Sequence, residues 1–377
     1  MSLFDYARDR ADDFAHALAA KRWQSCLLSA KLRDLRARSG MTQAQVASKA
    51  GISETAVRNY ELMRSTPKEG HLEALARAFA IRPEALRLYD VDYILAHALF
   101  QLGEVYGLRP VSRRHEFAYL APESPFMRRM LASWSEQYAA YRGGDVAAAD
   151  YEWWKDRYSA DFDMADFPLR YERDADGFHA IEPWQNVRFA SALRRLRKSR
   201  DMTQDDLARA TGISKSAIRS YEQKKRLPKI SQLEEIAEVL GVVRGALVFF
   251  DFGSPVQASH ALFQIANTYA LVPDVLDGEP ILRTVRAGLE QVIDQWADEL
   301  DAVAAGTAEL GYQEWKDIYD PEADMDHGDF RHAYIGRSRY VMRAVEMEGA
   351  GGSQVEMVGL SEHDPYDRRF DGGFLRA

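Results

Sequence analysis

The chain has 377 residues, of which 46% are hydrophobic and 11% aromatic, and it carries a formal charge of −9. This length and composition allow about two to four domains of roughly 100–200 residues each and argue against wholesale disorder. The single cysteine excludes an internal disulfide framework and a zinc site built on several thiolates, in keeping with a reducing cytosol. Because no apolar run approaches the about 20 residues of a membrane span and no signal-peptide pattern opens the sequence, we expect a cytoplasmic protein without membrane contact.

An internal repeat organises the chain. Residues 32–61, LRDLRARSGMTQAQVASKAGISETAVRNYE, align with residues 193–222, LRRLRKSRDMTQDDLARATGISKSAIRSYE, at an offset of 161. The segment HALFQ at 97–101 recurs at 260–264 with an offset of 163, so the repeat extends well beyond the first block. Two large copies are too few for a solenoid, and we interpret the chain as a duplicated two-part module, with a copy one and a copy two.

The charge is distributed unevenly over these copies. Residues 31–88 contain 11 Lys and Arg against 6 Asp and Glu, and residues 188–248 contain 14 against 7. The two blocks therefore carry +5 and +7, and the remainder of the chain carries −21. Such a pattern indicates two local anion-binding surfaces rather than a uniformly basic protein.

Short helices separated by turn signals are predicted in each basic block. In copy one, Thr42 and Ser53 are candidate N-caps, Gly51 ends the helix between them, and Pro67 closes the segment. The corresponding signals of copy two are Gly212, Ser214 and Pro228. Each block is thus expected to fold as a bundle of about four or five helices around a small core.

The acidic segments also have mainly helical spacing. The expected helices are 93–106, 126–141, 148–158, 256–269, 284–304 and 308–319. Two segments instead alternate around glycine-containing turns and predict β-hairpins, at 168–182 and 338–360. His97 and His260 recur within apolar helices, where packing or a hydrogen bond between helices is the expected role.

The basic blocks resemble the helix-turn-helix domain of the phage repressor/Cro family, also called XRE. The ordered pattern MTQ, Ala, GIS, a branched residue, YE and Pro occurs at 41–67 and again at 202–228. The family needs a small residue where two helices cross, which is Ala47 or Ala208, and an apolar plug from the second helix, which is Val57 or Ile218. The resemblance covers about 60 residues in each copy, and it implies that the second helix enters a DNA major groove about 12 Å wide.

The resemblance also implies which side chains meet DNA. The implied base-reading residues are Glu54, Thr55 and Asn59 in copy one and Lys215, Ser216 and Ser220 in copy two. Gln43 and Gln204 are implied to meet phosphate or the outer base pair, and Arg58 and Arg219 are candidates for contacts with phosphate or base edges. The implied phosphate clamp after the second recognition helix consists of Lys224, Lys225 and Arg226.

Several other residues of the two basic blocks have a structural interpretation. The candidate caps are Thr42, Ser53 and Ser214, the candidate internal ion pairs are Arg36 with Glu61 and Arg197 with Glu222, and the candidate core tyrosines are Tyr60 and Tyr221. Both copies depart from the family where a glycine is common after the recognition helix, because Met63 and Lys224 stand there. Copy one also has fewer charges in this loop and an acidic Glu54, so we expect copy two to be the stronger DNA binder.

We therefore expect a mainly all-α fold with two lambda-repressor-like helix-turn-helix bundles, each followed by an acidic helical module. The expected division is an N-terminal extension at 1–22, a first helix-turn-helix domain at 23–90, an acidic helical module with a hairpin at 91–183, a second helix-turn-helix domain at 184–250, a second acidic module at 251–330, and a β-hairpin with a loose tail at 331–377.

The sequence contains no P-loop, dinucleotide fingerprint, nucleophile elbow or HExxH motif, and we expect neither an enzyme nor a bound cofactor or metal. The expected function is a sequence-specific regulator of transcription that binds double-stranded DNA, with two non-identical heads acting as an internal pseudo-dimer on an asymmetric operator. The alternative is an antitoxin-like or other protein-interaction module whose helix-turn-helix units, or acidic modules, bind a protein partner. The sequence leaves homodimerisation, the operator and any effector open.

Overall fold

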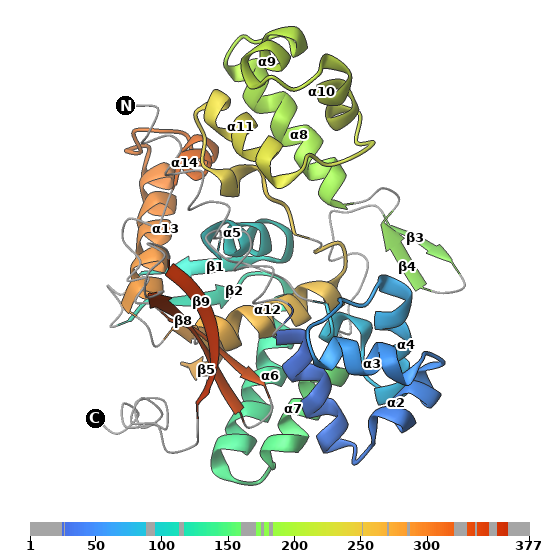
Figure 1. Cartoon of the computed structure of the whole chain (residues 1–377). Helices are drawn as coiled ribbons and strands as arrows, with labels where there is room; N and C mark the ends of the chain where they lie inside the picture. The colour runs from blue at the N-terminus through green and yellow to red at the C-terminus, as the bar shows by residue number, and fades with distance from the viewer. Residues whose placement is uncertain are drawn as a thin grey trace.

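The computed structural model describes residues 25–360 apart from 26, 88–94, 113–116, 160–170, 175–176, 181–183, 251, 270, 285–286, 320–329, 336–337 and 347–352. The predicted N-terminal extension and the loose tail beyond 360 lie outside this range. The chain forms two helical heads attached to a central body (Figure 1). We call residues 27–87 head one, residues 184–250 head two, and residues 95–158 together with 252–319 the central body.

The two heads contain the same succession of helices. Head one begins with a helix at 27–38 and continues with α2 (Gln43–Ala50), α3 (Glu54–Glu61), α4 (Glu69–Phe79) and the 3-10 turn η1 (Pro83–Ala85). Head two consists of α8 (Trp184–Ser199), α9 (Gln204–Thr211), α10 (Lys215–Glu222), α11 (Ile230–Leu240) and η4 (Arg244–Leu247). The two bundles predicted from the basic blocks are therefore confirmed.

The predicted caps set the ends of the short helices. The Thr42 hydroxyl accepts a hydrogen bond from the Gln45 amide, and the Ser53 hydroxyl accepts one from the Ala56 amide. Gly51 ends α2 in the left-handed region with φ of 66°, where a side chain is disfavoured. Copy two has the same cap at Ser214 and a left-handed Gly212.

Each head has a small core of its own. Val57 of α3 is 1% exposed and Ile218 of α10 is fully buried, so both predicted plugs lie inside their bundles. Tyr60 and Tyr221 are also buried, as predicted, and each hydroxyl is hydrogen-bonded, to His71 in head one and to Gln232 in head two. In each bundle, the helix predicted to enter the major groove, α3 or α10, therefore packs on the core through its apolar side and leaves its other side exposed.

The central body contains the helices predicted in the acidic segments. Copy one contributes α5 (Leu95–Tyr106), α6 (Pro125–Gly143) and α7 (Ala148–Arg157), and copy two contributes α12 (Pro255–Tyr269), α13 (Ala287–Ala305) and α14 (Tyr312–Ile318). A four-stranded antiparallel sheet joins them, in the order β1 (Leu108–Val111), β2 (Tyr119–Pro122), β6 (Glu279–Thr284) and β5 (Leu271–Leu276).

The sequence did not predict this sheet. Its strands are four to six residues long, and Pro110, Pro273 and Pro280 interrupt the β-branched pattern that normally signals a strand. The central pair, β2 with β6, joins strands at equivalent positions of the two copies, with Leu120 opposite Leu282. An antiparallel pairing of equivalent strands is what an approximate two-fold axis between the copies produces.

The two acidic segments, expected as separate modules, share one hydrophobic core. Helix α6 of copy one packs on β5 and β6 of copy two, and α13 of copy two packs on β1 of copy one. The core includes Trp134 and Phe263, whose rings meet edge to face, and Phe100 and Trp296, which meet in the same way. Neither segment completes this core alone, because each covers apolar surface of the other.

Polar side chains also form contacts between the two copies. His97 of α5 lies 3.2 Å from the carbonyl oxygen of Tyr319, and His260 of α12 lies 3.1 Å from that of Tyr158. Similarly, the Gln101 amide donates to Val248 at the end of head two, at 2.8 Å. The Gln264 amide donates to Arg87 at the end of head one. The predicted helix-to-helix role of both histidines is confirmed, and each head is held by a helix of the other copy.

Ion pairs attach the first helix of each head to the body. In copy one, Lys31 and Arg38 place nitrogens 2.5 and 2.7 Å from the Asp156 carboxylate. Burial would raise the pKa of Asp156, but the two cations outweigh it and hold this pKa below its ordinary value. In copy two, the guanidinium of Arg195 donates to both oxygens of Asp317, at 2.6 and 2.8 Å.

Two further small sheets are present. Strands β3 (Tyr171–Asp174) and β4 (Gly177–Ala180) form a hairpin, and β7 (Phe330–Ile335), β8 (Ser338–Glu346) and β9 (Ser353–Leu360) form a three-stranded sheet. Both predicted hairpins are confirmed, whereas β7 was not predicted. Within the described residues, no helix is both long and apolar enough to span a bilayer.

Candidate nucleic-acid interface

The recognition helices α3 and α10 present polar side chains to the surface. None of the thirteen residues predicted to meet DNA is buried: those of copy one are Gln43, Glu54, Thr55, Arg58 and Asn59, and those of copy two are Gln204, Lys215, Ser216, Arg219, Ser220, Lys224, Lys225 and Arg226. The apolar positions of the same helices face the core, since the 3.6-residue period separates the two sides. The exposed N-terminal turn of each helix is therefore available for contacts with a partner.

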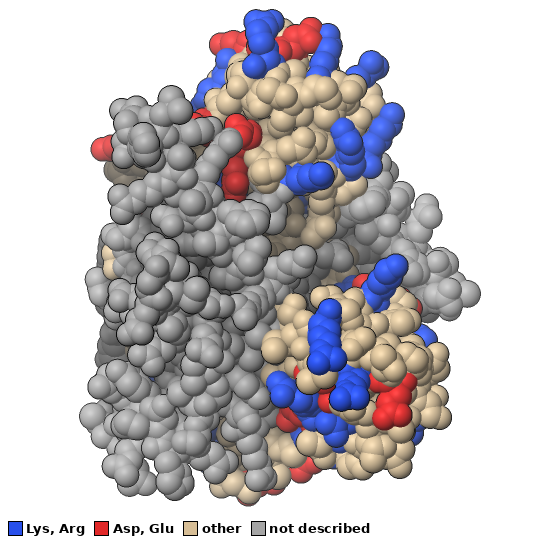
Figure 2. Space-filling view, in the orientation of Figure 1, with Lys and Arg blue, Asp and Glu red and all other residues tan. Residues whose placement is uncertain are grey.

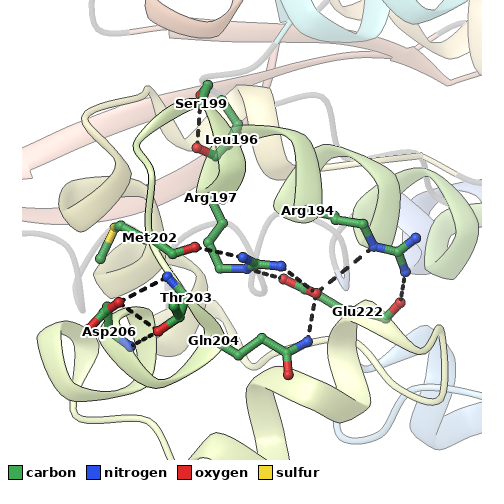
Figure 3. A network of polar contacts seen from close by, with 9 residues as sticks. All are labelled: Arg194, Leu196, Arg197, Ser199, Met202, Thr203, Gln204, Asp206 and Glu222. Carbon is green, nitrogen blue, oxygen red and sulfur yellow. Dashed lines mark hydrogen bonds and ion pairs between the residues drawn. The ribbon is translucent and has the colours of Figure 1, made fainter.

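A polar network holds α10 in place within head two (Figure 3). Arg197 of α8 donates to both oxygens of the Glu222 carboxylate, at 2.6 and 3.0 Å, and to the Met202 carbonyl at 2.6 Å. Gln204, the first residue of α9, donates to Glu222 at 2.8 Å. Burial alone would raise the pKa of Glu222, but the hydrogen bonds from Arg197 and Gln204 outweigh it and lower this pKa. The network joins three helices, and the predicted structural ion pair is confirmed.

Head one repeats this network. Arg36 donates to the two oxygens of Glu61 at 2.8 and 3.1 Å, and Gln43 donates to Glu61 at 2.7 Å. Gln43 and Gln204 were predicted to meet phosphate or the outer base pair. In this structure each amide is hydrogen-bonded to the carboxylate at the end of the recognition helix, which orients it at the start of α2 or α9.

The turn after each recognition helix uses a strained backbone. Met63 has φ of 58° and Lys224 has φ of 64°, so both occupy the left-handed region that a glycine at this position would favour. In head two the Asn186 side chain donates to the Lys224 carbonyl at 2.9 Å, and Arg194 donates to the Glu222 carbonyl at 2.8 Å. Sequence reasoning missed these two supporting residues because the basic, helical pattern of 184–199 does not reveal which residues face the turn.

The loop after α10 is basic, whereas the loop after α3 is largely neutral. Lys225 and Arg226 are exposed, and the Arg226 guanidinium lies 5.2 Å from the centre of the Tyr221 ring, a cation–π contact that orients it. The corresponding loop of head one exposes Leu62 and Met63, which are 44% and 47% accessible. Basic side chains project from both heads in Figure 2.

The first residue of the recognition helix also differs. Lys215 pairs with Asp205 of α9 at 2.5 Å, but both side chains are more than half exposed, so this pair is weak and can be exchanged for another anion. Glu54 occupies the equivalent position in head one, where a carboxylate stabilises the positive end of the helix dipole. The two heads thus present opposite charges at the first residue of the recognition helix.

Comparison with known proteins agrees with this geometry. Residues 27–88 match a family described as helix-turn-helix domain, and residues 193–244 match a family described as helix-turn-helix. The chain thus carries two helix-turn-helix domains in tandem. It is similar to the cryptic phage CTXphi transcriptional repressor RstR of Vibrio cholerae, at 35% identity over 60 residues, which are 16% of this chain and 54% of the repressor.

The tandem helix-turn-helix protein therefore spans about half the length of the curated relative it matches. No solved structure matches it significantly. Among the residues that the structure describes, no group of three or more His, Cys, Asp or Glu side chains is arranged to hold a metal ion.

Proposed function

We propose that the protein is a regulator of transcription that binds double-stranded DNA in a sequence-specific manner through α3 and α10. One observation carries this proposal: both recognition helices present a polar N-terminal turn, and a partly buried network of an arginine, a glutamate and a glutamine holds each helix in place. Such a turn enters the major groove in helix-turn-helix proteins, where polar side chains pair with base edges. The base-reading residues we propose are Glu54, Thr55, Asn59, Lys215, Ser216 and Ser220.

We further propose that the two heads act as an internal pseudo-dimer. Dimeric helix-turn-helix proteins read half-sites about 34–36 Å apart, and a two-fold axis in the protein corresponds to a palindrome in the DNA. The exchanged contacts of the central body and the β2–β6 pairing support this arrangement. Copy one has Glu54 and Thr55 where copy two has Lys215 and Ser216. Because the two heads therefore read bases with different side chains, the operator should be asymmetric.

The ion pairs that attach the heads leave the recognition helices out. Lys31, Arg38 and Arg195 belong to the first helix of each head, and they pair with Asp156 or Asp317 of the body. This arrangement supports a body that sets the spacing of the heads, as opposed to one that masks their DNA-facing side.

The test is the affinity for duplex DNA as a function of salt concentration. Each neutralised phosphate contributes about 0.9 to the slope of log affinity against log salt. The double variant Lys225→Gln and Arg226→Gln should reduce this slope by about 1.8. Arg244→Gln serves as the control, because it removes a charge from η4, outside the proposed interface. A salt-independent, barely measurable affinity for DNA would contradict the proposal and favour a protein partner.

Selection of bound sequences from a random duplex pool tests the pseudo-dimer. We expect one asymmetric site containing two different half-sites. A perfect palindrome would contradict the asymmetric operator while leaving DNA binding itself intact.

A further inference from the structure

A cavity of about 210 Å³ lies at the junction of head two and the central body. Helix α8 and η4 of head two form one side of it, and α5 and α14 of the body form the other. At about 30 Å³ for each molecule in the liquid, this space corresponds to roughly seven waters. It is therefore large enough for a small organic molecule.

Two small residues of copy two shape this junction. Ala192 stands where copy one has Lys31, whose side chain crosses the junction to Asp156 with a nitrogen–oxygen distance of 2.5 Å. Gly245 stands where copy one has Glu84, and it lets η4 lie directly against α5, since a Cβ atom at this position would lie 2.3 Å from the His97 ring. The space between head and body therefore depends on Ala192, because copy one carries a long side chain at this position that crosses the junction.

Among the described residues, the cavity lining has one more cation than it has carboxylates. Arg188, Arg195 and Lys316 line it together with two carboxylates, Glu104 and Asp317. Arg195 pairs with Asp317, while Arg188 and Lys316 both pair with Glu104. Burial lowers the pKa of Lys316 to about 8, which still leaves this amine mostly protonated at pH 7. The described lining thus offers three cationic groups against two carboxylates.

The same cavity has an aromatic wall. Phe100 is 2% exposed and Phe249 is partly buried, and the Arg188 guanidinium lies 5.7 Å from the centre of the Phe249 ring. Guanidinium groups match the geometry of carboxylate and phosphate oxygens, and aromatic walls accept a ring or a short apolar group.

We propose that this cavity binds a small organic anion, namely a carboxylate or phosphate carried on a ring or short apolar group. The anionic group meets the Arg188, Arg195 and Lys316 cluster, and the apolar part lies along the two phenylalanines. An occupant touches head two and the body at once, so its binding is linked to the position of head two. Copy one carries Lys31 and Glu84 in place of Ala192 and Gly245, so copy one is not the site we propose.

The test is calorimetric titration of the full chain with four probes of similar shape. Benzoate and phenyl phosphate carry the proposed anionic group, benzamide is neutral, and benzylamine is cationic. We expect at least one anion to bind about tenfold or more tightly than benzamide, and benzylamine to bind more weakly still. The two anions distinguish a carboxylate ligand from a phosphate ligand.

Variants then locate the site. Ala192→Lys, which introduces the residue of copy one, and Arg188→Leu, which introduces the counterpart of Leu27, should each weaken anion binding about tenfold or more. Arg209→Leu removes a charge from an exposed side chain of head two and should leave binding unchanged. If Ala192→Lys loses its folded circular dichroism spectrum, Ala192→Met fills the same space without adding a charge. Equal binding of all four probes, no binding of any probe, or anion binding that survives both cavity variants would overturn the proposal.

Discussion

Head one and head two share a frame and differ on its surface. Equivalent residues form the ion pair, the caps and the apolar plug in both, at a constant offset of 161. Yet the first residue of the recognition helix is Glu54 in one head and Lys215 in the other, and the loop that follows is basic in head two alone. The comparison shows that buried residues set the orientation of the recognition helix, while exposed ones can change without disturbing it.

The largest expected difference concerns the buried ion pair. The Arg197 side chain is 11% exposed and that of Arg36 is 29% exposed, although both are bidentate to a glutamate that is 4% exposed. Arg197→Met leaves Glu222 buried without its partner and should cost about 3–5 kcal/mol, whereas Arg36→Met should cost about 1–2 kcal/mol. Hydrogen exchange of the amides in α8–α10 and in α2–α3 measures each head separately. Equal losses in the two heads would break the comparison.

A second prediction concerns a buried histidine of the central body, which the described residues of the heads do not have in their cores. Burial lowers the pKa of His260 to about 4, well below the 6.5 of an exposed histidine. Between pH 6.5 and 4 the unfolded state binds a proton that the folded state does not, so stability falls as the pH falls. The loss should reach about 3 kcal/mol at pH 4 and is absent above pH 7.

The variant His260→Gln isolates this contribution, because it removes the titrating group and keeps a side-chain donor. Urea unfolding at a series of pH values should show the stability difference between wild type and variant shrinking as the solution is acidified. Parallel curves from pH 7 to 4 would show that His260 does not titrate as expected.

A third prediction rests on the proposed function and concerns the surface difference itself. Glu54→Lys should raise the affinity of head one for DNA about tenfold and increase the salt slope by about 0.9, and Lys215→Glu should do the reverse in head two. Glu73→Lys is the matched control, because it makes the same charge change at an exposed position of α4. If the control raises affinity as much as Glu54→Lys does, the effect comes from net charge and the two recognition helices do not differ as we propose.

The smallest expected effect concerns the left-handed turns. Met63→Gly should stabilise head one by about 0.5–1 kcal/mol, because relief of the strained φ of 58° exceeds the entropic cost of the glycine. Lys224→Gly should give a similar gain in head two. Arg64→Gly is the control: it adds the same flexibility at a residue without a positive φ and should destabilise. Thermal unfolding distinguishes these signs.

Local signals in the sequence were sufficient for the heads. The caps at Thr42 and Ser53, the left-handed Gly51 and the paired Arg36 and Glu61 all depend on residues less than 30 positions apart, and their spacing is visible as a pattern. The candidate interface followed for the same reason, since exposure alternates with burial along a helix. The contacts of Asn186 and Arg194 with the turn after α10 could not be predicted in this way, because they depend on which side of α8 faces that turn.

The central body shows the opposite case. Its helices were predicted, but the sheet was not, since four-residue strands with prolines have little periodicity of their own. The sequence also could not predict that His97 and His260 each contact a carbonyl of the other copy. A repeat shows that two segments are alike, but it does not show which partner each segment packs against.

The sequence by itself thus determined two helix-turn-helix frames, their exposed polar turns and the unequal charge of the two heads. Only the tertiary structure decided that the acidic segments share one core, that each head is held by a helix of the other copy, and that a cavity lies beside head two. The physical reason is range. Capping, helical periodicity and charge spacing act within a few turns of the chain, whereas strand pairing and packing join residues more than 100 positions apart whose choice of partner depends on shape.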